Sequence, residues 1–211
     1  LLSQHPAVET RLLAEIDAVL GTGPDARLPT VADLPRLAYV EQVVAETLRL
    51  YPPAFSLARR VLEPVQLDGH ELSPNTLAII PIWGLHRSPR YYPDPLRFDP
   101  ERFTAAARAA RPRHAYMPFS YGPRNCIGEN FAWMEAVLIL TVLAQRFQFR
   151  LAPGQKVEPQ PVLTLRAKYG MEFKEDLQMA IGLRYQAIAN GQIEVVNGYA
   201  TDGMIDRKSV V

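Results

Sequence analysis

Cysteine is nearly absent from this chain, and Cys126 is the only one among 211 residues. A single cysteine excludes an internal disulfide bond and fits a reducing compartment. The first residues do not show the pattern of a secretory leader, which is a basic segment followed by a short apolar run. We therefore expect a cytoplasmic protein.

A strong charge imbalance and a long apolar run are also lacking. Lys and Arg number 23 against 22 Asp and Glu, a formal net charge of +1, so the bulk charge gives no indication of nucleic-acid binding. The longest apolar candidate, residues 131–144, is interrupted by Glu135 and is shorter than the roughly 20 residues that cross a bilayer. We expect no nucleic-acid partner and no membrane-spanning segment in this chain.

The apolar pattern that is present predicts helices joined by long ordered loops. Apolar residues recur at helical spacing over residues 6–20, 37–50 and 129–147. Short apolar runs predict strands at 65–67 and 76–82, the second one buried, with Asp68-Gly69 as a hairpin turn. This pattern favours a mainly α fold with small β-sheets. On the third helix we expect one apolar stripe of Phe131, Met134, Leu138 and Val142, broadened by Ala132, Val137, Leu140 and Ala144.

The single cysteine lies in a distinctive stretch, residues 119–128, which reads FSYGPRNCIG. Glycine permits positive φ and lets the backbone approach another body closely, and proline stiffens the turn. Cys126 falls at or just before a predicted helix start, where amide N–H groups favour an anion, so the position suits a thiolate. Taken alone, a lone cysteine is more often a small buried apolar residue, and the pattern leaves both readings open.

This stretch resembles the haem-binding loop of cytochromes P450, F-x-x-G-x-R-x-C-x-G, at every fixed position: Phe119, Gly122, Arg124, Cys126 and Gly128. The resemblance implies haem b, iron protoporphyrin IX, as the cofactor. Cys126 would be the metal ligand and the catalytic residue, an axial thiolate that favours O–O cleavage. Phe119 would pack beside the sulfur and limit solvent access, and Arg124 would meet a haem propionate.

A second part of the resemblance lies at Glu46 and Arg49, which are three residues apart and share a helix face. By itself such a pair is a surface salt bridge worth well under about 1 kcal/mol. Here it precedes YPP at residues 51–53, as in the K helix of P450s, and PERF at residues 100–103 matches the motif that supplies a third partner. The resemblance implies a buried structural ion network of Glu46, Arg49 and Arg102 on the proximal side of the haem.

Three further positions have more than one interpretation. Arg59 falls where the family has a propionate-binding arginine, and Arg60 is the alternative residue for this role. The other interpretation is that both side chains are solvated. His86 fits a satisfied loop or core histidine better than an iron ligand. Trp83 and Arg87 resemble a haem-contacting W-x-x-x-R pattern that belongs far upstream in the family, so we interpret that match as coincidence.

The resemblance covers residues 1–173 and only the C-terminal part of a P450 haem domain. That incomplete fold runs from the J helix onward: K helix, β hairpin, meander, haem loop, L helix and terminal strands, one of them over residues 161–169. The distal I helix, with its acid/alcohol pair for proton delivery to bound oxygen, is lacking, and we expect the chain to start just after it. The basic residues 105–114 imply either a docking surface for an acidic redox partner or a solvated loop.

From residue 174 onward the sequence departs from the P450 pattern. Residues 175–205 resemble a fragment of an osmoprotectant (glycine betaine or choline) ABC-transporter substrate-binding protein, and residues 206–211 resemble a translated sequencing adapter. A predicted helix at 177–189 has an apolar stripe with no designed partner in a P450. We expect residues 174–211 to be a foreign, chimeric tail, with a lineage-specific extension as the alternative.

The function that the resemblance implies is that of a haem-thiolate monooxygenase. Such an oxidoreductase inserts one oxygen atom from O2 into an apolar organic substrate, with electrons from a ferredoxin or flavoprotein reductase. Peroxygenase or isomerase chemistry on the same scaffold is one rival. A solute-binding fragment, which accounts for the tail only, and a truncated product without function are the others. We expect this chain alone, without the distal half, to be inactive.

Overall fold

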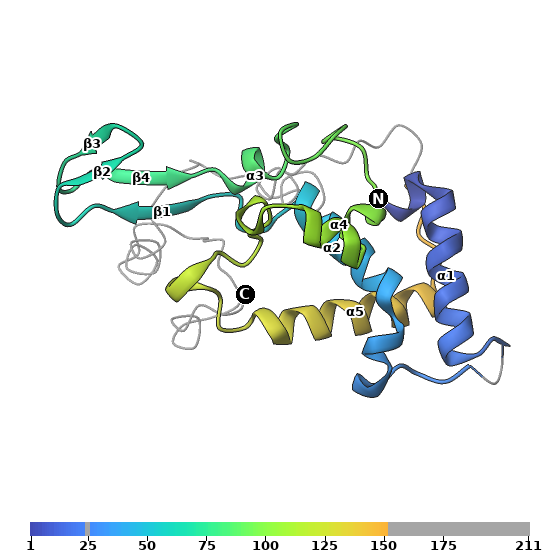
Figure 1. The fold of residues 1–211 in the computed structure, drawn as a ribbon. Coiled ribbons are helices and arrows are strands. Elements are labelled where there is room, and N and C mark those ends of the chain that lie inside the picture. The colour runs from blue at the N-terminus through green and yellow to red at the C-terminus, as the bar shows by residue number, and fades with distance from the viewer. Residues whose placement is uncertain (24–25, 152–211) are drawn as a thin grey trace, which may run out of the picture. The chain divides into compact units, whose positions relative to one another are not determined.

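The computed structural model describes residues 1–23 and 26–151, which Figure 1 shows as a coloured ribbon. The predicted strand at 161–169 and the predicted helix at 177–189 lie outside the described residues. The described part is mainly helical with two small antiparallel sheets, which confirms the predicted fold class. Within it, no helix has the length and the apolar character that a bilayer crossing requires.

Two helices form where the apolar spacing predicts them, α1 (Pro6–Leu20) and α2 (Ala38–Leu50). Pro6 opens α1 at a position whose N–H has no helical partner, so the missing donor costs nothing. Gly21, with a φ of 86°, ends α1, because glycine takes this left-handed conformation readily. Helix α2 ends at Leu50, and Pro52 then restricts Tyr51 to a non-helical conformation.

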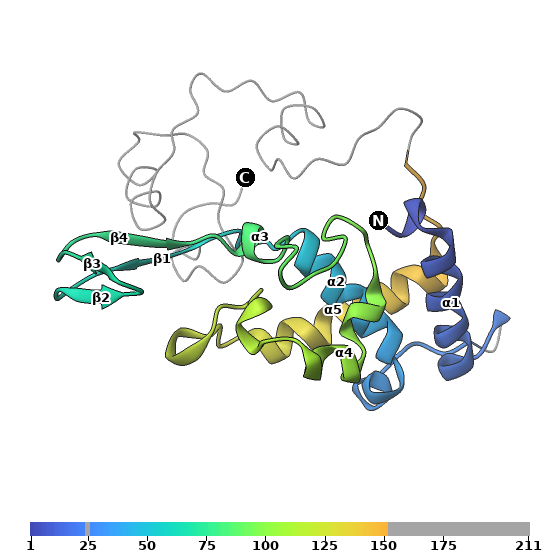
Figure 2. The same cartoon turned by 45° about the horizontal axis from the view of Figure 1, so that its top comes forward.

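The third predicted helix, α5 (Glu129–Arg146), packs against both α1 and α2, as Figures 1 and 2 show. The stripe expected for it is wrong at Phe131, which is 61% exposed, whereas Val137, one of the residues expected to broaden it, is buried together with Thr141. Helix α5 is apolar around most of its circumference, so apolar spacing alone does not select a face. The core shared by the three helices includes Leu12, Ile16, Leu20, Leu37, Val40, Val43, Leu50, Phe98 and Val137.

Four short strands make two antiparallel pairs. Strand β1 (Leu57–Arg60) pairs with β4 (Leu77–Ile80), and β2 (Val65–Leu67) pairs with β3 (His70–Leu72). Asp68 and Gly69 have φ values of 49° and 79°, as both central residues of a type I′ turn require. The predicted hairpin at this turn is therefore confirmed.

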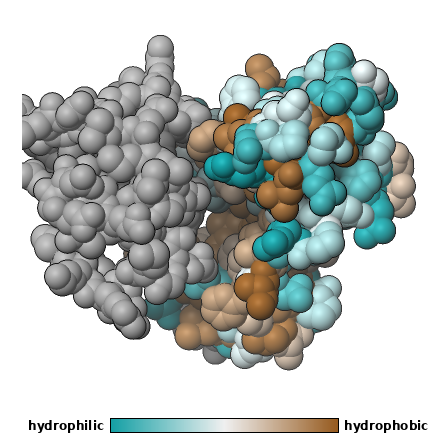
Figure 3. Space-filling model, turned by 90° about the vertical axis from the view of Figure 1, so that its left-hand side faces the viewer, coloured by the Kyte–Doolittle hydropathy of each residue, from teal (hydrophilic) through white to brown (hydrophobic). Residues whose placement is uncertain are grey.

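The prediction of a buried strand over residues 76–82 is wrong in extent and in burial. Strand β4 ends at Ile80, and Ile82 begins a short helix, α3 (Ile82–Leu85). Leu77 is 57% exposed and Ile79 62%. A continuous apolar run favours a strand covered on both faces, but this one belongs to a two-stranded ribbon. Figure 3 looks from the hairpin side and shows apolar residues at the surface among polar ones.

The segment between α3 and α5 consists of turns and one short helix, α4 (Ala105–Ala110). Thr104 starts α4, with its hydroxyl oxygen accepting the Ala107 N–H at 3.3 Å. This proline-rich stretch leads from α3 to the cysteine loop. The 3-10 turns within the described residues include η1 (Leu2–Gln4), η3 (Val31–Arg36), η4 (Pro100–Phe103), η5 (Arg113–Ala115) and η6 (Gly122–Arg124).

Candidate functional site

The side chains of Glu46 and Arg49 pair inside the fold, near the end of α2. Both side chains are fully buried. The guanidinium of Arg49 donates from Nε to Glu46 Oε2 at 2.6 Å and from Nη2 to Glu46 Oε1 at 2.7 Å. This is the two-pronged geometry that makes arginine–carboxylate pairs strong and directional.

The remaining donors of Arg49 hold the loop that follows α3. Nη1 donates to the carbonyl oxygens of His86 at 2.8 Å and Pro95 at 2.7 Å, and Nη2 donates to that of Arg97 at 3.1 Å. These carbonyls belong to a segment with little regular secondary structure, so their hydrogen bonds must come from elsewhere. One buried guanidinium therefore fixes the path of residues 86–97 against α2.

Glu46 has two further contacts, one to Arg102 of the PERF segment and one to Asp99, the residue before it. Its Oε1 accepts the Asp99 N–H at 2.8 Å and lies 3.6 Å from Arg102 Nε. The Arg102 side chain is 10% exposed, and its Nη2 donates to the Asp94 carbonyl at 2.9 Å. The structure thus brings together the three residues expected to form an ion network, with Arg102 at its edge.

The cysteine loop closes on itself by main-chain hydrogen bonds. The Cys126 N–H donates to the Phe119 carbonyl at 2.9 Å, and the Asn125 N–H donates to the Gly122 carbonyl at 3.0 Å. Gly122 has a φ of 78°, a conformation that side chains with a Cβ adopt only with strain. Cys126 is a free and exposed cysteine that precedes the first residue of α5 by three positions. The closed loop therefore presents a free thiol at the surface of the described part.

The other residues expected around the haem lie in different environments. The ring of Phe119 is half-buried and stands 5.9 Å from that of Trp133, centroid to centroid. Gly128 precedes α5, and a Cβ there would lie 3.9 Å from Cys126 Sγ, an ordinary contact distance. Arg124 is exposed.

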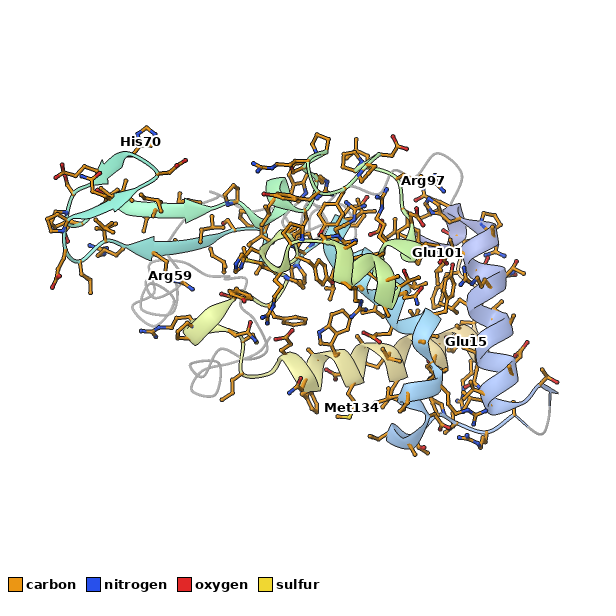
Figure 4. All side chains as sticks on the ribbon, in the orientation of Figure 1. Glu15, Arg59, His70, Arg97, Glu101 and Met134 are labelled. Carbon is orange, nitrogen blue, oxygen red and sulfur yellow. The ribbon has the colours of Figure 1, made fainter. Side chains whose placement is uncertain are left out.

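Arg59, the other cation expected at a propionate, lies on β1 and is exposed. Figure 4 labels it on this strand. Its Nη1 donates only to the adjacent Ala58 carbonyl, at 2.9 Å, among the described residues. The guanidinium of Arg59 is thus available to an external anion.

A basic cavity of about 590 Å³ lies beside the cysteine loop. Arg108, Arg111 and Arg113 line it together with Glu129, so its charge is net positive. Phe119, Tyr121 and Gly122 of the loop also contribute, whereas Cys126 is not among its lining residues. The basic stretch 105–114 and the cysteine loop therefore share a hollow on this part of the surface.

Sequence reasoning missed the part that His86 plays in this arrangement. The predicted interpretation was a satisfied histidine, and the side chain is indeed fully buried. Its Nε2 accepts the Met117 N–H at 2.9 Å, but its Nδ1 has no hydrogen-bond partner among the described residues. The HRSP sequence that follows α3 gives no signal for a side-chain bond to a backbone amide 31 positions later.

Comparison with known proteins decides the family. A sequence profile described as Cytochrome P450 matches residues 1–173. The chain belongs to the cytochrome P450 family. The predicted resemblance, its extent and the assignment of the chain to an oxidoreductase family that uses haem iron are thereby confirmed.

Curated P450 relatives agree with the profile. "Putative cytochrome P450 132" of Mycobacterium tuberculosis is 42% identical over 171 residues, which are 81% of this chain and 36% of the relative. "Cyclooctatin synthase" of Streptomyces melanosporofaciens is 41% identical over 167 residues, covering 79% and 36%. "Cytochrome P450 4V2" of Homo sapiens is 44% identical over 147 residues, covering 70% and 28%. The chain spans about a third of the length of these relatives.

A second profile matches the end of the chain. Its description is Substrate binding domain of ABC-type glycine betaine transport system, and it covers residues 152–211. The match agrees with the resemblance predicted for residues 175–205 and overlaps the P450 match over 152–173. All of these residues lie outside the described part of the structure.

The described residues fit a thiolate-ligated haem of the P450 type. The loop holds a free thiol in a fixed backbone frame. Ile127 is fully exposed and Phe131 is 61% exposed. These two residues near Cys126 in the chain offer apolar surface, which suits the apolar face of a porphyrin. Arg124 and Arg59 are exposed cations of the kind that propionates bind.

The buried His86 leads to a prediction for the stability of this P450 part in acid. Burial, and next the charge of Arg49, lower the pKa of His86 from 6.5 to about 4. As the pH falls from 6.5 to about 4, the unfolded chain binds a proton at His86 and the folded chain does not. The free energy of unfolding should therefore fall across this window by about 3 kcal/mol.

Urea unfolding at a series of pH values measures this dependence. The stability contribution of neutral His86 is fully present above pH 6.5 and is lost by about pH 4. The carboxyl groups also titrate in this range, but they change the stability of the wild type and of a variant without His86 by the same amount. His86→Gln should thus show a shallower decline than the wild type. Parallel curves for the two proteins would contradict a neutral buried His86.

Proposed function

We propose that this chain supplies the C-terminal part of the haem domain of a haem-thiolate monooxygenase. Residues 1–173 form that part, and Cys126 is the axial ligand of the iron. The observation that carries the proposal is a free, exposed cysteine in a loop closed on Phe119 by a 2.9 Å hydrogen bond, within a chain of the P450 family. Haem b, when bound, supplies O2 activation, and the thiolate favours O–O cleavage.

The residues around Cys126 have separate tasks in this proposal. The ring of Phe119 limits water access to the sulfur, and solvent access affects the reduction potential of the iron. Gly122 provides the left-handed turn that closes the loop, and Gly128 lies beside the sulfur, where a Cβ would stand 3.9 Å from it. Arg124 and Arg59 bind the propionates by charge-assisted hydrogen bonds. The network around Arg49 keeps the preceding loop in place.

The whole enzyme would act on an apolar organic molecule, inserting one oxygen atom from O2. Electrons would come from a ferredoxin or a flavoprotein reductase, and the basic cavity lined by Arg108, Arg111 and Arg113 has the charge that an acidic partner surface requires. We propose a cytoplasmic location, since the chain has one cysteine, and no nucleic-acid partner, since the net charge is +1.

Residues 174–211 have no task in this proposal. We infer that they are a foreign tail, as the match of residues 152–211 to a glycine betaine binding domain suggests. That match spans 60 residues and leaves the cysteine loop at residues 119–128 unexplained, so we do not propose solute binding as the function of residues 1–173.

The tail and the haem site can be tested together. Titration of the 211-residue chain with ferric haem should give weak binding with the absorbance of a thiolate ligand, and no monooxygenase turnover. Deleting residues 174–211 should leave the dissociation constant unchanged, because the P450 match ends at residue 173. Limited proteolysis should cut near residue 174 first.

Two outcomes would overturn this account of the tail. A loss of haem binding on deletion, together with protection of the chain near residue 174, would make the tail an integral part of the fold. Turnover by the undeleted chain with a reductase would show that it needs no distal half. As the matched control, Arg150→Ala changes an exposed residue and should leave the titration as it is.

A further inference from the structure

His86 stands between the buried ion network and the segment that leads into the cysteine loop. It directly follows α3 and is fully buried. Its carbonyl oxygen accepts from Arg49 Nη1 at 2.8 Å, and its ring Nε2 accepts the Met117 N–H at 2.9 Å. The ion network thus holds the main chain of His86 through Arg49, and the side chain of His86 in turn holds the main chain at Met117.

From Met117, hydrogen bonds continue to the cysteine. The Met117 carbonyl accepts the Ser120 N–H at 3.2 Å, and the Phe119 carbonyl accepts the Cys126 N–H at 2.9 Å. Ser120 has a φ of 73°, a conformation uncommon for residues other than glycine, so the surrounding contacts must hold this turn. The His86–Met117 bond is the side-chain contact at the start of that turn.

The ring has a single tautomer that satisfies this geometry. An imidazole nitrogen that accepts an N–H must carry no proton, so the proton of the neutral ring resides on Nδ1. The ring also stacks on Tyr116 with 5.2 Å between centroids and 26° between planes. Tyr116 in turn donates its hydroxyl proton to the Ala45 carbonyl of α2 at 2.9 Å. The tautomer leaves a lone pair on Nε2, and the stacking on Tyr116 orients the ring so that this lone pair faces the Met117 N–H.

We propose that His86 is a positioning residue for the cysteine loop. Through the Met117 N–H it sets where residues 117–120 run, and through them the place from which Cys126 approaches the iron. The consequence for the iron depends on the proposed haem-thiolate function, whereas the bond to Met117 does not. An apolar side chain in place of His86 would leave the buried Met117 N–H without an acceptor, and an unpaired buried donor carries its full desolvation penalty.

Two substitutions separate the acceptor from the ring. His86→Gln can place its amide oxygen where Nε2 lies, whereas the side chain of His86→Asn is one carbon shorter and ends near the Nδ1 position. Both variants lose the imidazole and its stacking on Tyr116. His70→Asn serves as the control, because His70 is exposed on β3, and Figure 4 labels it on the hairpin.

The first measurement is hydrogen exchange of the Met117 amide in the 211-residue chain without haem. Exchange should be faster in His86→Asn than in the wild type by roughly tenfold to hundredfold, the cost of an unpaired buried donor. In His86→Gln it should stay within about threefold of the wild type, and in His70→Asn it should not change. The Val43 amide in α2 reports global unfolding. Equal Met117 protection in the Gln and Asn variants would overturn the proposal.

Nitrogen NMR of the wild-type chain gives a test that does not require a stable variant. The Nδ1-protonated tautomer of His86, with a scalar coupling between Nε2 and the Met117 amide, is the expected result. An Nε2-protonated ring would overturn the proposal even if His86→Asn does not fold.

The second readout adds haem. In excess haem, the carbon-monoxide spectrum of the reduced wild type and of His86→Gln should show the thiolate-ligated band, and His86→Asn should show a loss of that band. Identical bands in the two variants would overturn the link to the iron. If the wild type itself lacks a thiolate band, the proposed function fails, and the Met117 exchange still decides what His86 does.

Discussion

Replacing Arg49 with alanine is expected to lower the free energy of unfolding of the chain by about 3–5 kcal/mol. The buried guanidinium makes hydrogen bonds to both oxygens of Glu46 and to the carbonyls of His86, Pro95 and Arg97. Alanine leaves the buried Glu46 with only the more distant Arg102 as a charge partner, and it leaves three carbonyls without the donors of Arg49. A loss of this size is a large share of the roughly 5–15 kcal/mol that stabilises a typical domain.

Arg150→Ala provides the matched comparison for this experiment. Arg150 pairs with Glu9 at 2.9 Å, but its side chain is 51% exposed, so its removal should cost less than about 1 kcal/mol. Urea unfolding followed by circular dichroism measures both variants. Arg49→Ala should also bind haem more weakly than the wild type in the haem titration. An Arg49→Ala protein as stable as Arg150→Ala, with the haem affinity of the wild type, would mean that the pair with Glu46 behaves as a surface salt bridge.

The spacing of Glu46 and Arg49 predicts from sequence that they share a helix face, and no more. Spacing is silent on burial, because the same pattern occurs on solvated helices. Burial was expected only through the P450 resemblance. The carbonyls of His86, Pro95 and Arg97 could not be predicted, because the path of an irregular segment depends on tertiary contacts that leave no periodic signal.

The helices show what periodicity can and cannot determine. Helices α1 and α2 have apolar residues on one side, and their predicted bounds agree with the structure to within a residue. The bounds of α5 were equally well predicted, but its inner face was predicted only in part. With apolar residues on nearly all sides, the burial of Val137 rather than Phe131 is decided by where α1 and α2 lie.

The strands illustrate a second limit. The turn at Asp68 and Gly69 was predictable, since its positive φ values follow from the local chemistry of the dipeptide. The exposure of Leu77 and Ile79 was not, because apolar composition indicates what can be buried and not whether a second layer is present. Burial of this kind depends on the rest of the fold.

The cysteine site was readable from sequence only because its residues are contiguous. Five positions of residues 119–128 define the loop, and the structure closes it by bonds within that stretch. The support from His86 comes from 31 positions away from Met117 through a single hydrogen bond. A lone histidine before a proline-rich loop gives no sequence signal for such a contact.

Replacing Cys126, the proposed ligand of the iron, has the other large expected effect. In the proposed site the thiolate of Cys126 would donate electron density to the iron, which would shift the carbon-monoxide band of the reduced haem to the position typical of thiolate ligation. Histidine at this position would offer a neutral imidazole nitrogen instead, and the electron donation would fall.

The measurement is the reduced carbon-monoxide difference spectrum of the wild-type chain and of Cys126→His, each in excess haem. The account predicts a thiolate-type band for the wild type and a band at the imidazole-ligated position for Cys126→His. The same band in both proteins would show that Cys126 does not bind the iron.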